Sequence, residues 1–184
     1  MSEVVESLEI ALLSHERKGR SQGTIAKAFP GFCEEKHELI LVYDYMVNGT
    51  LKSHLHRSDN DPLLWKKWLE ICIDTARGLE YLHTNVQQFV HCDLNSSNVL
   101  LDDKWVVKIA GFEHSVLIPA SMATEGVEKS IIYEMGYIGS VEYFDPEYMH
   151  TSKVTKKTDV YAFGVVVLKV LCAKTPCFRN RNTG

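Results

Sequence analysis

Residues 91–98 are His-Cys-Asp-Leu-Asn-Ser-Ser-Asn, a dense polar cluster between a long helical pattern and a predicted β-hairpin. The cluster places a carboxylate, Asp93, and an amide, Asn98, five residues apart on what should be a loop. A carboxylate in such a place can orient a hydroxyl group and accept its proton, and an amide oxygen can hold a divalent metal on nucleotide phosphates. The pair therefore indicates the chemistry of phosphoryl transfer, with Asp93 and Asn98 in those two roles.

The elements on either side of this cluster follow from hydrophobic periodicity. Apolar residues recur at helical spacing over residues 64–83, which predicts an amphipathic helix that places Trp65 and Trp68 in a core. After the cluster, residues 99–101 and 105–109 are short strand-like runs separated by an Asp-Asp turn, so we expect a hairpin there.

The rest of the chain gives further signals for a single domain. Its patterns predict a helix over residues 3–14, a buried strand over 38–46, a short helix over 50–56 and a helix over 159–172. Residues 111–147 show no sustained period, so we expect a long loop, which in a compact domain is usually functional or mobile.

Composition excludes several classes of protein. Hydrophobic residues make up 45% of the 184 residues and charged residues 24%, a balance typical of one globular domain. The 20 basic and 24 acidic residues argue against a nucleic-acid surface or a polybasic membrane patch. The five cysteines form no CxxC pair, which fits a reducing compartment and indicates no zinc site. The longest apolar run, residues 160–173, is too short to span a bilayer and contains Lys169, so we expect a buried helix, with no membrane segment and no secretory leader.

In several places the chain resembles a protein kinase domain. His91-Cys92-Asp93 is similar to the catalytic-loop motif H-R-D, and Asn98 to the metal-binding asparagine that follows it. Asp145-Pro146-Glu147 is similar to the A-P-E motif, and residues 159–164 (DVYAFG) are similar to the helix that supports the catalytic loop. With the stretches GFCEE, LVYDYM, ARGLEYLH and YFDPEY, the chain resembles plant receptor-like Ser/Thr kinases, especially the malectin-like receptor group.

The resemblance implies an α+β, protein-kinase-like fold with a partial N-lobe over residues 1–47 and a mainly helical, partial C-lobe over residues 48–184. By the family pattern we expect a truncated domain, because the Gly-rich loop and the lysine of V-A-I-K are missing before the first helix. The last helices of the C-lobe are also missing after Arg179. We expect apolar surface to be exposed in their absence.

The resemblance also implies ATP and magnesium as cofactors, together with the residues that would bind them. Asp93 corresponds to the proton acceptor, and Asn98 to the residue that binds nucleotide and metal. The backbone of Asp44 and Met46 would hydrogen-bond adenine at the hinge between the lobes, and Leu100 would pack beneath the base.

The departures from the family pattern fall at positions that bind the metal ion or neutralise phosphate charge. The magnesium-binding D-F-G motif is Gly111-Phe112-Glu113 here, so the ligating carboxylate is absent. Cys92 replaces the arginine of H-R-D, and Asn95 replaces the lysine that helps to neutralise the transferred phosphoryl group. Glu142 stands at a glycine of G-[TS]-x-G-Y, and we expect it to disturb substrate docking.

These observations predict a degenerate kinase domain that does not transfer phosphate and acts, if at all, by binding a partner. In that interpretation loop hydrogen bonds hold Asp93, Asn98 makes a structural contact in the loop, and His91 packs on Phe112 in the core. Two alternatives stay open: an active ATP-dependent kinase that phosphorylates Ser and Thr hydroxyls of proteins, and a chain with no stable fold.

The expected partner is a protein, with no nucleic acid and no membrane segment in this chain. Another kinase could also act on hydroxyl groups of the predicted loop, which are Ser115, Ser121, Thr124, Ser130, Tyr133 and Tyr137. We expect a cytoplasmic location, either for this chain alone or as the cytosolic part of a membrane receptor in a longer chain.

Overall fold

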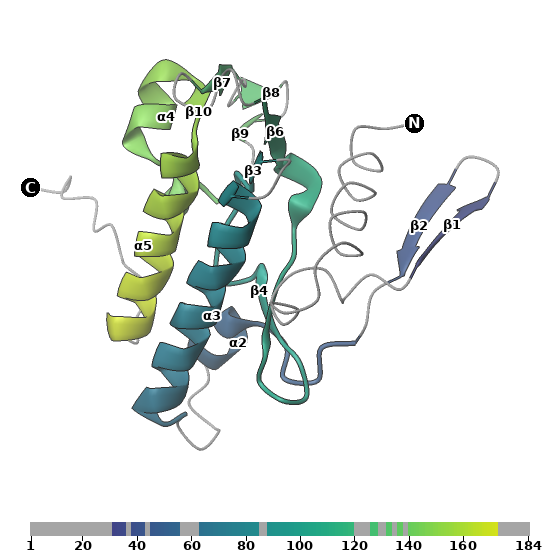
Figure 1. Ribbon diagram of the computed structural model, residues 1–184, viewed down its shortest axis with the longest axis vertical. Coiled ribbons are helices and arrows are strands. Elements are labelled where there is room, and N and C mark those ends of the chain that lie inside the picture. The colour runs from purple at the N-terminus through teal and green to yellow at the C-terminus, as the bar shows by residue number, and fades with distance from the viewer. Residues whose placement is uncertain are drawn as a thin grey trace, which may run out of the picture.

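The computed structural model describes residues 31–35, 38–42, 45–55, 63–84, 88–119, 126–128, 132–133, 136–137 and 140–172. Two long helices, α3 (Trp65–Thr84) and α5 (Lys156–Cys172), lie side by side and contact small antiparallel sheets (Figure 1). The expected α+β class is confirmed. The helix predicted over residues 3–14 and the hinge residue Asp44 lie outside the described residues.

The other described elements are short. The helices are α2 (Leu51–Leu55) and α4 (Pro146–Thr151), with the 3-10 turns η1 (Phe112–His114) and η3 (Val141–Tyr143). Three hairpins pair β1 (Gly31–Glu35) with β2 (Glu38–Val42), β4 (Val99–Leu101) with β5 (Val107–Ile109), and β8 (Ile132–Tyr133) with β9 (Gly136–Tyr137). Two further pairs join distant segments, namely β3 (Gln88–Val90) with β6 (Val116–Ile118), and β7 (Val127–Glu128) with β10 (Lys153–Val154).

Helix α3 confirms the predicted helix, with one exception to its predicted burial. Its buried side chains include Ile71, Leu79 and Leu82, which pack toward β3, β5 and α5. The prediction that Trp65 belongs to the core is wrong, because Trp65 is 53% exposed. Trp65 is the first residue of α3 and lies five full turns before the buried His83, so it is on the covered face but at the end of the helix, where the partner elements no longer cover it. Trp68 is partly buried against the core, as expected.

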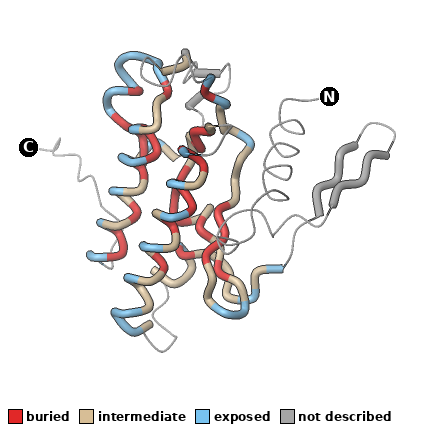
Figure 2. The backbone as a smooth tube through the Cα atoms, in the orientation of Figure 1, coloured by how far each residue is buried: buried red, intermediate tan, exposed pale blue. Residues whose placement is uncertain are grey.

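One hydrophobic core joins α3, α5, α2 and the β4–β5 hairpin, and buried positions line the facing sides of the two long helices (Figure 2). Leu51, Leu94, Val99 and Val107 are fully buried in it. The residues of the β4–β5 hairpin pair in register, Val99 with Ile109, so the predicted hairpin is confirmed. The polar cluster 91–98 is therefore held between a core helix and a core hairpin.

The long loop predicted over residues 111–147 is partly ordered, which corrects that prediction. Within its described parts lie strand β6, the short strands β7 to β9, and the turns η1 and η3. Strands of two or three residues, such as Val116–Ile118 on Gln88–Val90, are too short to give a periodic signal. Strands β6 and β7 pair with segments distant in the sequence, so the local sequence does not predict them.

Helix α5 begins at Lys156, three residues before the predicted start. Its first turn is polar and carries no apolar period, and Thr155 helps to set it because its carbonyl accepts from the backbone N–H of Thr158 at 3.0 Å. The predicted strand 38–46 is confirmed over Glu38–Val42, where β2 ends, and residues 43–44 lie outside the described residues. Among the described residues, no helix combines the length and apolar character needed to cross a membrane.

Candidate active site

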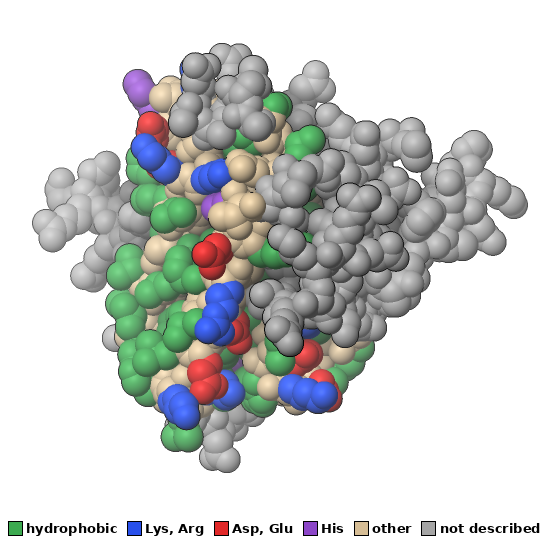
Figure 3. Space-filling model, in the orientation of Figure 1, with side chains coloured by type: hydrophobic (Ala, Val, Ile, Leu, Met, Phe, Trp, Pro, Cys, Tyr) green, Lys and Arg blue, Asp and Glu red, His purple; other side chains and the backbone are tan. Residues whose placement is uncertain are grey.

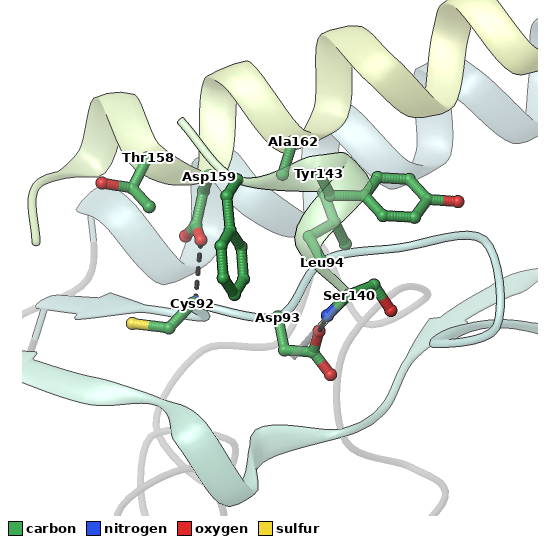
Figure 4. Close-up of a pocket in the computed structure, with 9 residues that line it drawn as sticks. Cys92, Asp93, Leu94, Ser140, Tyr143, Thr158, Asp159 and Ala162 are labelled. Atoms are coloured by element: carbon green, nitrogen blue, oxygen red, sulfur yellow. Dashed lines mark hydrogen bonds between the residues drawn. The ribbon is translucent and has the colours of Figure 1, made fainter. Parts of the chain in front are cut away.

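The loop of residues 91–98 is anchored by α5. The Asp159 carboxylate, of a residue only 1% exposed, accepts from the backbone N–H of His91 at 2.8 Å and of Cys92 at 3.0 Å. It also accepts from His83 Nε2 of α3 at 2.8 Å. One buried acceptor therefore ties both long helices to the start of the loop, as the view of Asp159 above Cys92 shows (Figure 4).

His91 is a core histidine, as the sequence suggested. It is fully buried, and its ring centroid lies 4.9 Å from that of Phe112. Its Nε2 donates to the carbonyl of Ala110 at 2.9 Å, and its Nδ1 accepts from the backbone N–H of Asp93 at 3.2 Å. The ring thus joins the loop to the segment that contains Gly111.

The carboxylate of Asp93 is held by donors of the protein itself. Oδ1 accepts from Asn95 Nδ2 at 3.2 Å and from the backbone N–H of Ser140 at 3.4 Å, and Oδ2 accepts from Asn98 Nδ2 at 3.1 Å. The Ser140 contact is drawn in Figure 4. The family pattern has a lysine next to Asp93. Here Asn95 occupies that place with a neutral amide.

Asn98 points inward, toward Asp93 and Gly111. Its Nδ2 also donates to the Asp93 carbonyl at 2.8 Å, and its own carbonyl accepts from the backbone N–H of Ala110 at 2.9 Å. Gly111 has a left-handed φ of +82°, and a Cβ added there would lie 2.5 Å from Asn98 Cγ and 2.7 Å from its Oδ1. The amide of Asn98 occupies the space in which any side chain at position 111 would begin.

These residues do not fit a magnesium ion. Position 111 contributes no ligand, so of the two metal positions in the family pattern only Asn98 keeps an oxygen, Oδ1, that could bind the ion, while its Nδ2 donates to Asp93. Within the part of the chain that the structure describes, no group of three or more His, Cys, Asp or Glu side chains is arranged to hold a metal. Glu113, two residues beyond Gly111, is exposed on η1.

A small pocket lies between the loop and α5 (Figure 4). Cys92 lines this pocket and has a positive φ of 67°. Its thiol donates to the Val90 carbonyl at 3.5 Å. The residues that line the pocket are Cys92, Asp93, Leu94, Ser140, Tyr143, Phe144, Thr158, Asp159 and Ala162. The thiol is a much shorter side chain than the arginine that the family pattern has here, and it carries no bidentate donor for phosphate.

Of the three predicted nucleotide positions within the described residues, Met46 and Leu100 lie on segments that pair through their backbones. Met46 ends the hinge segment, and its carbonyl accepts from the backbone N–H of Gly49 at 2.9 Å in a turn. Thr50 then forms an isolated β-bridge with Leu100, and the Asn48 N–H donates to the Leu101 carbonyl at 3.2 Å. The structure therefore places Leu100 beside the segment that follows Met46.

A buried lysine supports the segment after Ser140, and sequence reasoning did not find this contact. Lys169 of α5 is 4% exposed, and its Nζ donates to Glu142 Oε1 and to the Tyr143 hydroxyl, each at 2.6 Å. The Tyr143 hydroxyl lies 3.0 Å from Ser96 Oγ. Glu142 was noted as a departure and Lys169 as a charge in an apolar run, but 27 residues separate the two and nothing local pairs them.

Two side chains of α3 have shifted acidity, and neither belongs to the 91–98 loop. Burial raises the pKa of the Cys72 thiol above its ordinary value. The hydrogen bond from Lys67 at 2.6 Å is the main cause that lowers the pKa of Glu70. Ser115 is one of the loop hydroxyl groups that another kinase was expected to phosphorylate. Its Oγ donates a hydrogen bond to the His91 carbonyl at 3.2 Å.

The anchored loop, the hairpin behind it and the supporting helix define a protein kinase domain. Residues 21–183 match the family model for protein tyrosine and serine/threonine kinases, and the chain belongs to that family.

Within the family, the chain is similar to receptor-like kinases of Arabidopsis thaliana. It is 49% identical over 145 residues to a probable receptor-like protein kinase, and 46% identical over the same length both to receptor-like protein kinase FERONIA and to receptor-like protein kinase THESEUS 1. Each match covers 78% of this chain and 15% to 17% of the relative. The chain thus spans only a small part of the length of these curated relatives.

Proposed function

We propose that this chain is a degenerate kinase domain of receptor-like Ser/Thr type that does not transfer phosphate and acts by binding a partner protein. The observation that carries the proposal is Gly111, which supplies no carboxylate at the metal position and has the Asn98 amide in the space beside it. Magnesium supplies the main countercharge to a triphosphate in this chemistry, and electrostatic stabilisation usually dominates its rate. A site without that ligand loses the largest contribution to catalysis.

Two further charges are absent from the same site. Asn95 donates to Asp93 as a neutral amide where a cation would face the transferred phosphoryl group. Cys92 supplies a thiol where the family pattern has an arginine. We therefore propose that Asp93, the proton acceptor by resemblance, no longer acts on a substrate hydroxyl, and that Asn98 holds the loop and no metal.

The same proposal covers the nucleotide positions, the lobes and the location. Asp44, Met46 and Leu100 would form the adenine site, which we propose does not bind ATP with magnesium at cellular concentrations. We assign residues 1–47 to the N-lobe and 48–184 to the C-lobe, and propose that the domain works on the cytosolic side of the membrane. ATP and magnesium are the cofactors that the family generally uses.

Exposed apolar side chains of the two long helices support partner binding. Figure 3 shows hydrophobic side chains gathered over this side of the molecule. On α3 and the residue before it these are Leu64, Trp65, Leu69 and Ile73, and on α5 they are Val160, Tyr161, Leu168 and Leu171. A contiguous patch of exposed apolar side chains on a protein surface is typical of an interaction site.

A phosphotransfer assay with labelled ATP and magnesium tests the lost activity, with the kinase domain of a curated relative as positive control. We expect no incorporation into this chain or into general Ser/Thr substrates beyond the level of the Asp93→Asn variant. Incorporation that Asp93→Asn abolishes would overturn the proposal and establish an active kinase.

Capture of proteins from plant extract by the immobilised chain tests partner binding. We expect a specific protein to be retained by the wild type and released by Leu168→Asp, while Lys157→Asp, an exposed change on the same helix, retains it. Equal retention by all three chains would contradict binding through this face.

A further inference from the structure

Gly126 precedes strand β7, which pairs with strand β10 near α4 (Figure 1). Its φ is left-handed at +79°, and a Cβ built there would lie 2.8 Å from the carbonyl oxygen of Val154 and 2.8 Å from Thr155 Cγ2. Real Cβ atoms essentially never approach another heavy atom within 3.0 Å. Only a glycine therefore permits this close approach of the two segments.

Neither neighbour of Gly126 can move aside easily. The nearest atom of Val154 belongs to the backbone, and the Val154 side chain is fully buried. Thr155 is fixed where α5 begins, because its Oγ1 accepts from the Lys157 N–H at 3.2 Å and its carbonyl accepts from the Thr158 N–H at 3.0 Å. A side chain at position 126 would therefore push β7 away from β10.

Apolar contacts hold β7 in the same place. Val127, which is paired in register with Val154, packs against a second hydrophobic cluster. The buried members of this cluster are Val90, Ile118, Phe144, Tyr148 and Val154. Cys92 packs against the same cluster. The residue that replaces the arginine of the family pattern thus lies with the apolar side chains that support β7.

The arginine that the family pattern has at position 92 would hold a phosphate on this segment through bidentate hydrogen bonds, which a thiol does not form. We propose that residues 126–128 form a clasp, which holds β7 on β10 without a phosphate through the close contact at Gly126 and the cluster around Val154. Order in this part of the chain then does not require another kinase to act on its hydroxyl groups. The inference goes beyond the proposed function and does not depend on it, since it concerns how this segment is held and is tested without nucleotide.

Residue-resolved hydrogen exchange of the full chain tests the clasp. The chain is first treated with phosphatase until mass spectrometry detects no phosphate on it. We expect the hydrogen-bonded amides of β7 and β10 to exchange at least about tenfold slower than in an unstructured peptide. Exchange as fast as in the peptide, or protection that develops only after phosphorylation by the kinase domain of a curated relative, would overturn the proposal.

The variant Gly126→Ala tests the close contact. We expect it to remove the protection of β7 while α3 stays protected, because the added Cβ separates the two strands and leaves the main core intact. Gly49→Ala is the matched control, because Gly49 also has a left-handed φ, +65°, but a Cβ there would meet only Ser53 Oγ at 3.4 Å. It reports backbone strain alone and should leave β7 protected. Protection of β7 that persists in Gly126→Ala would overturn the clasp.

A third variant covers the case in which Gly126→Ala does not fold. Val127→Thr keeps the shape of the side chain and places a hydroxyl group against the apolar cluster. We expect the β7 amides of this variant to exchange at least about threefold faster than those of the wild type. Unchanged exchange would show that the apolar contact does not hold β7, and would overturn the proposal without the glycine variant.

Discussion

At the scale of single residues, Asp159 shows how one buried carboxylate can determine a loop. It accepts from two backbone N–H groups of the 91–98 loop and from a histidine of α3. Each of these donors is buried or partly buried. If the acceptor is lost, the donors have no hydrogen-bond partner, because water does not readily reach them. Through these hydrogen bonds the Asp159 side chain links α5 to the two residues before Asp93, and so helps to position Asp93.

Replacement of this acceptor should be among the most harmful single changes. We expect Asp159→Ala to lower the free energy of unfolding by roughly 3 kcal/mol or more, because three donors lose their acceptor. Urea unfolding at equilibrium measures the change. Asp74→Ala is the control, since Asp74 pairs only with the exposed Arg77 and should cost less than about 1 kcal/mol. Equal costs for the two variants would contradict the anchoring role.

The Cys72 thiol gives a pH-dependent prediction. Burial raises its pKa, so the folded state keeps the proton to higher pH than the unfolded chain does. The stability linked to this thiol is fully present below the unfolded pKa, about 8.5, and is lost as the pH rises through the folded value. We expect iodoacetamide at pH 8 to modify Cys72 more slowly than the exposed Cys172, as peptide mass spectrometry can measure. Faster modification of Cys72 would contradict the prediction.

At the scale of elements, α5 does more than pack against α3. Lys169 lies on its buried side and holds both Glu142 and Tyr143 of η3, and the Tyr143 hydroxyl reaches Ser96 of the loop. Lys169 Nζ also lies 4.0 Å from the centroid of the Tyr143 ring. Glu142 is a departure from the family pattern, and its carboxylate has a buried cation as its partner here. Glu142, which was expected to disturb substrate docking, therefore contributes to the packing of η3 against α5.

This pairing predicts a non-additive pair of substitutions. We expect Lys169→Met to lower the free energy of unfolding by about 1–2 kcal/mol, because it removes the partner of the Glu142 carboxylate, whose side chain is 37% exposed, and one of the partners of the Tyr143 hydroxyl. Adding Glu142→Ala should recover part of that loss, because the double variant no longer contains the unpaired carboxylate. Lys157→Met, an exposed change on the same helix, should have little effect. Additive costs in urea unfolding would show that the pair is not coupled.

The elements also show which features the sequence determines locally. Helix α3 and the β4–β5 hairpin were predictable because their apolar residues recur at the period of the element itself. The burial of Trp65 was predicted wrongly because periodicity locates an apolar stripe but not the point along the helix at which the partner elements stop covering it. The β3–β6 pair was missed since three-residue strands have no period.

The candidate site divides in the same way. The loop residues Asp93 and Asn98 were found because a motif of eight consecutive residues contains them both. The contact of Asn98 with the space at Gly111, and that of Lys169 with Glu142, join residues that lie far apart in the chain. Tertiary packing creates such contacts, so residue spacing alone does not reveal them.

At the scale of the whole molecule, the central claim is that a kinase domain has kept its loop architecture and lost its metal chemistry. The supporting contacts of the loop, from Asp159 and His91, are intact, whereas position 111 has no carboxylate. Fold and catalysis rest on different residues here, so one can persist without the other. Binding of ATP with magnesium is the property on which the two accounts, degenerate and active, differ most clearly.

Thermal unfolding of the purified chain alone, with ATP plus magnesium, and with ATP plus EDTA tests that claim most directly. We expect one cooperative transition whose midpoint is the same within error in all three conditions. A domain that bound the complex would gain about 5–10 °C at a hundredfold excess over the dissociation constant. A rise of that size with ATP plus magnesium, and none with EDTA, would contradict the account.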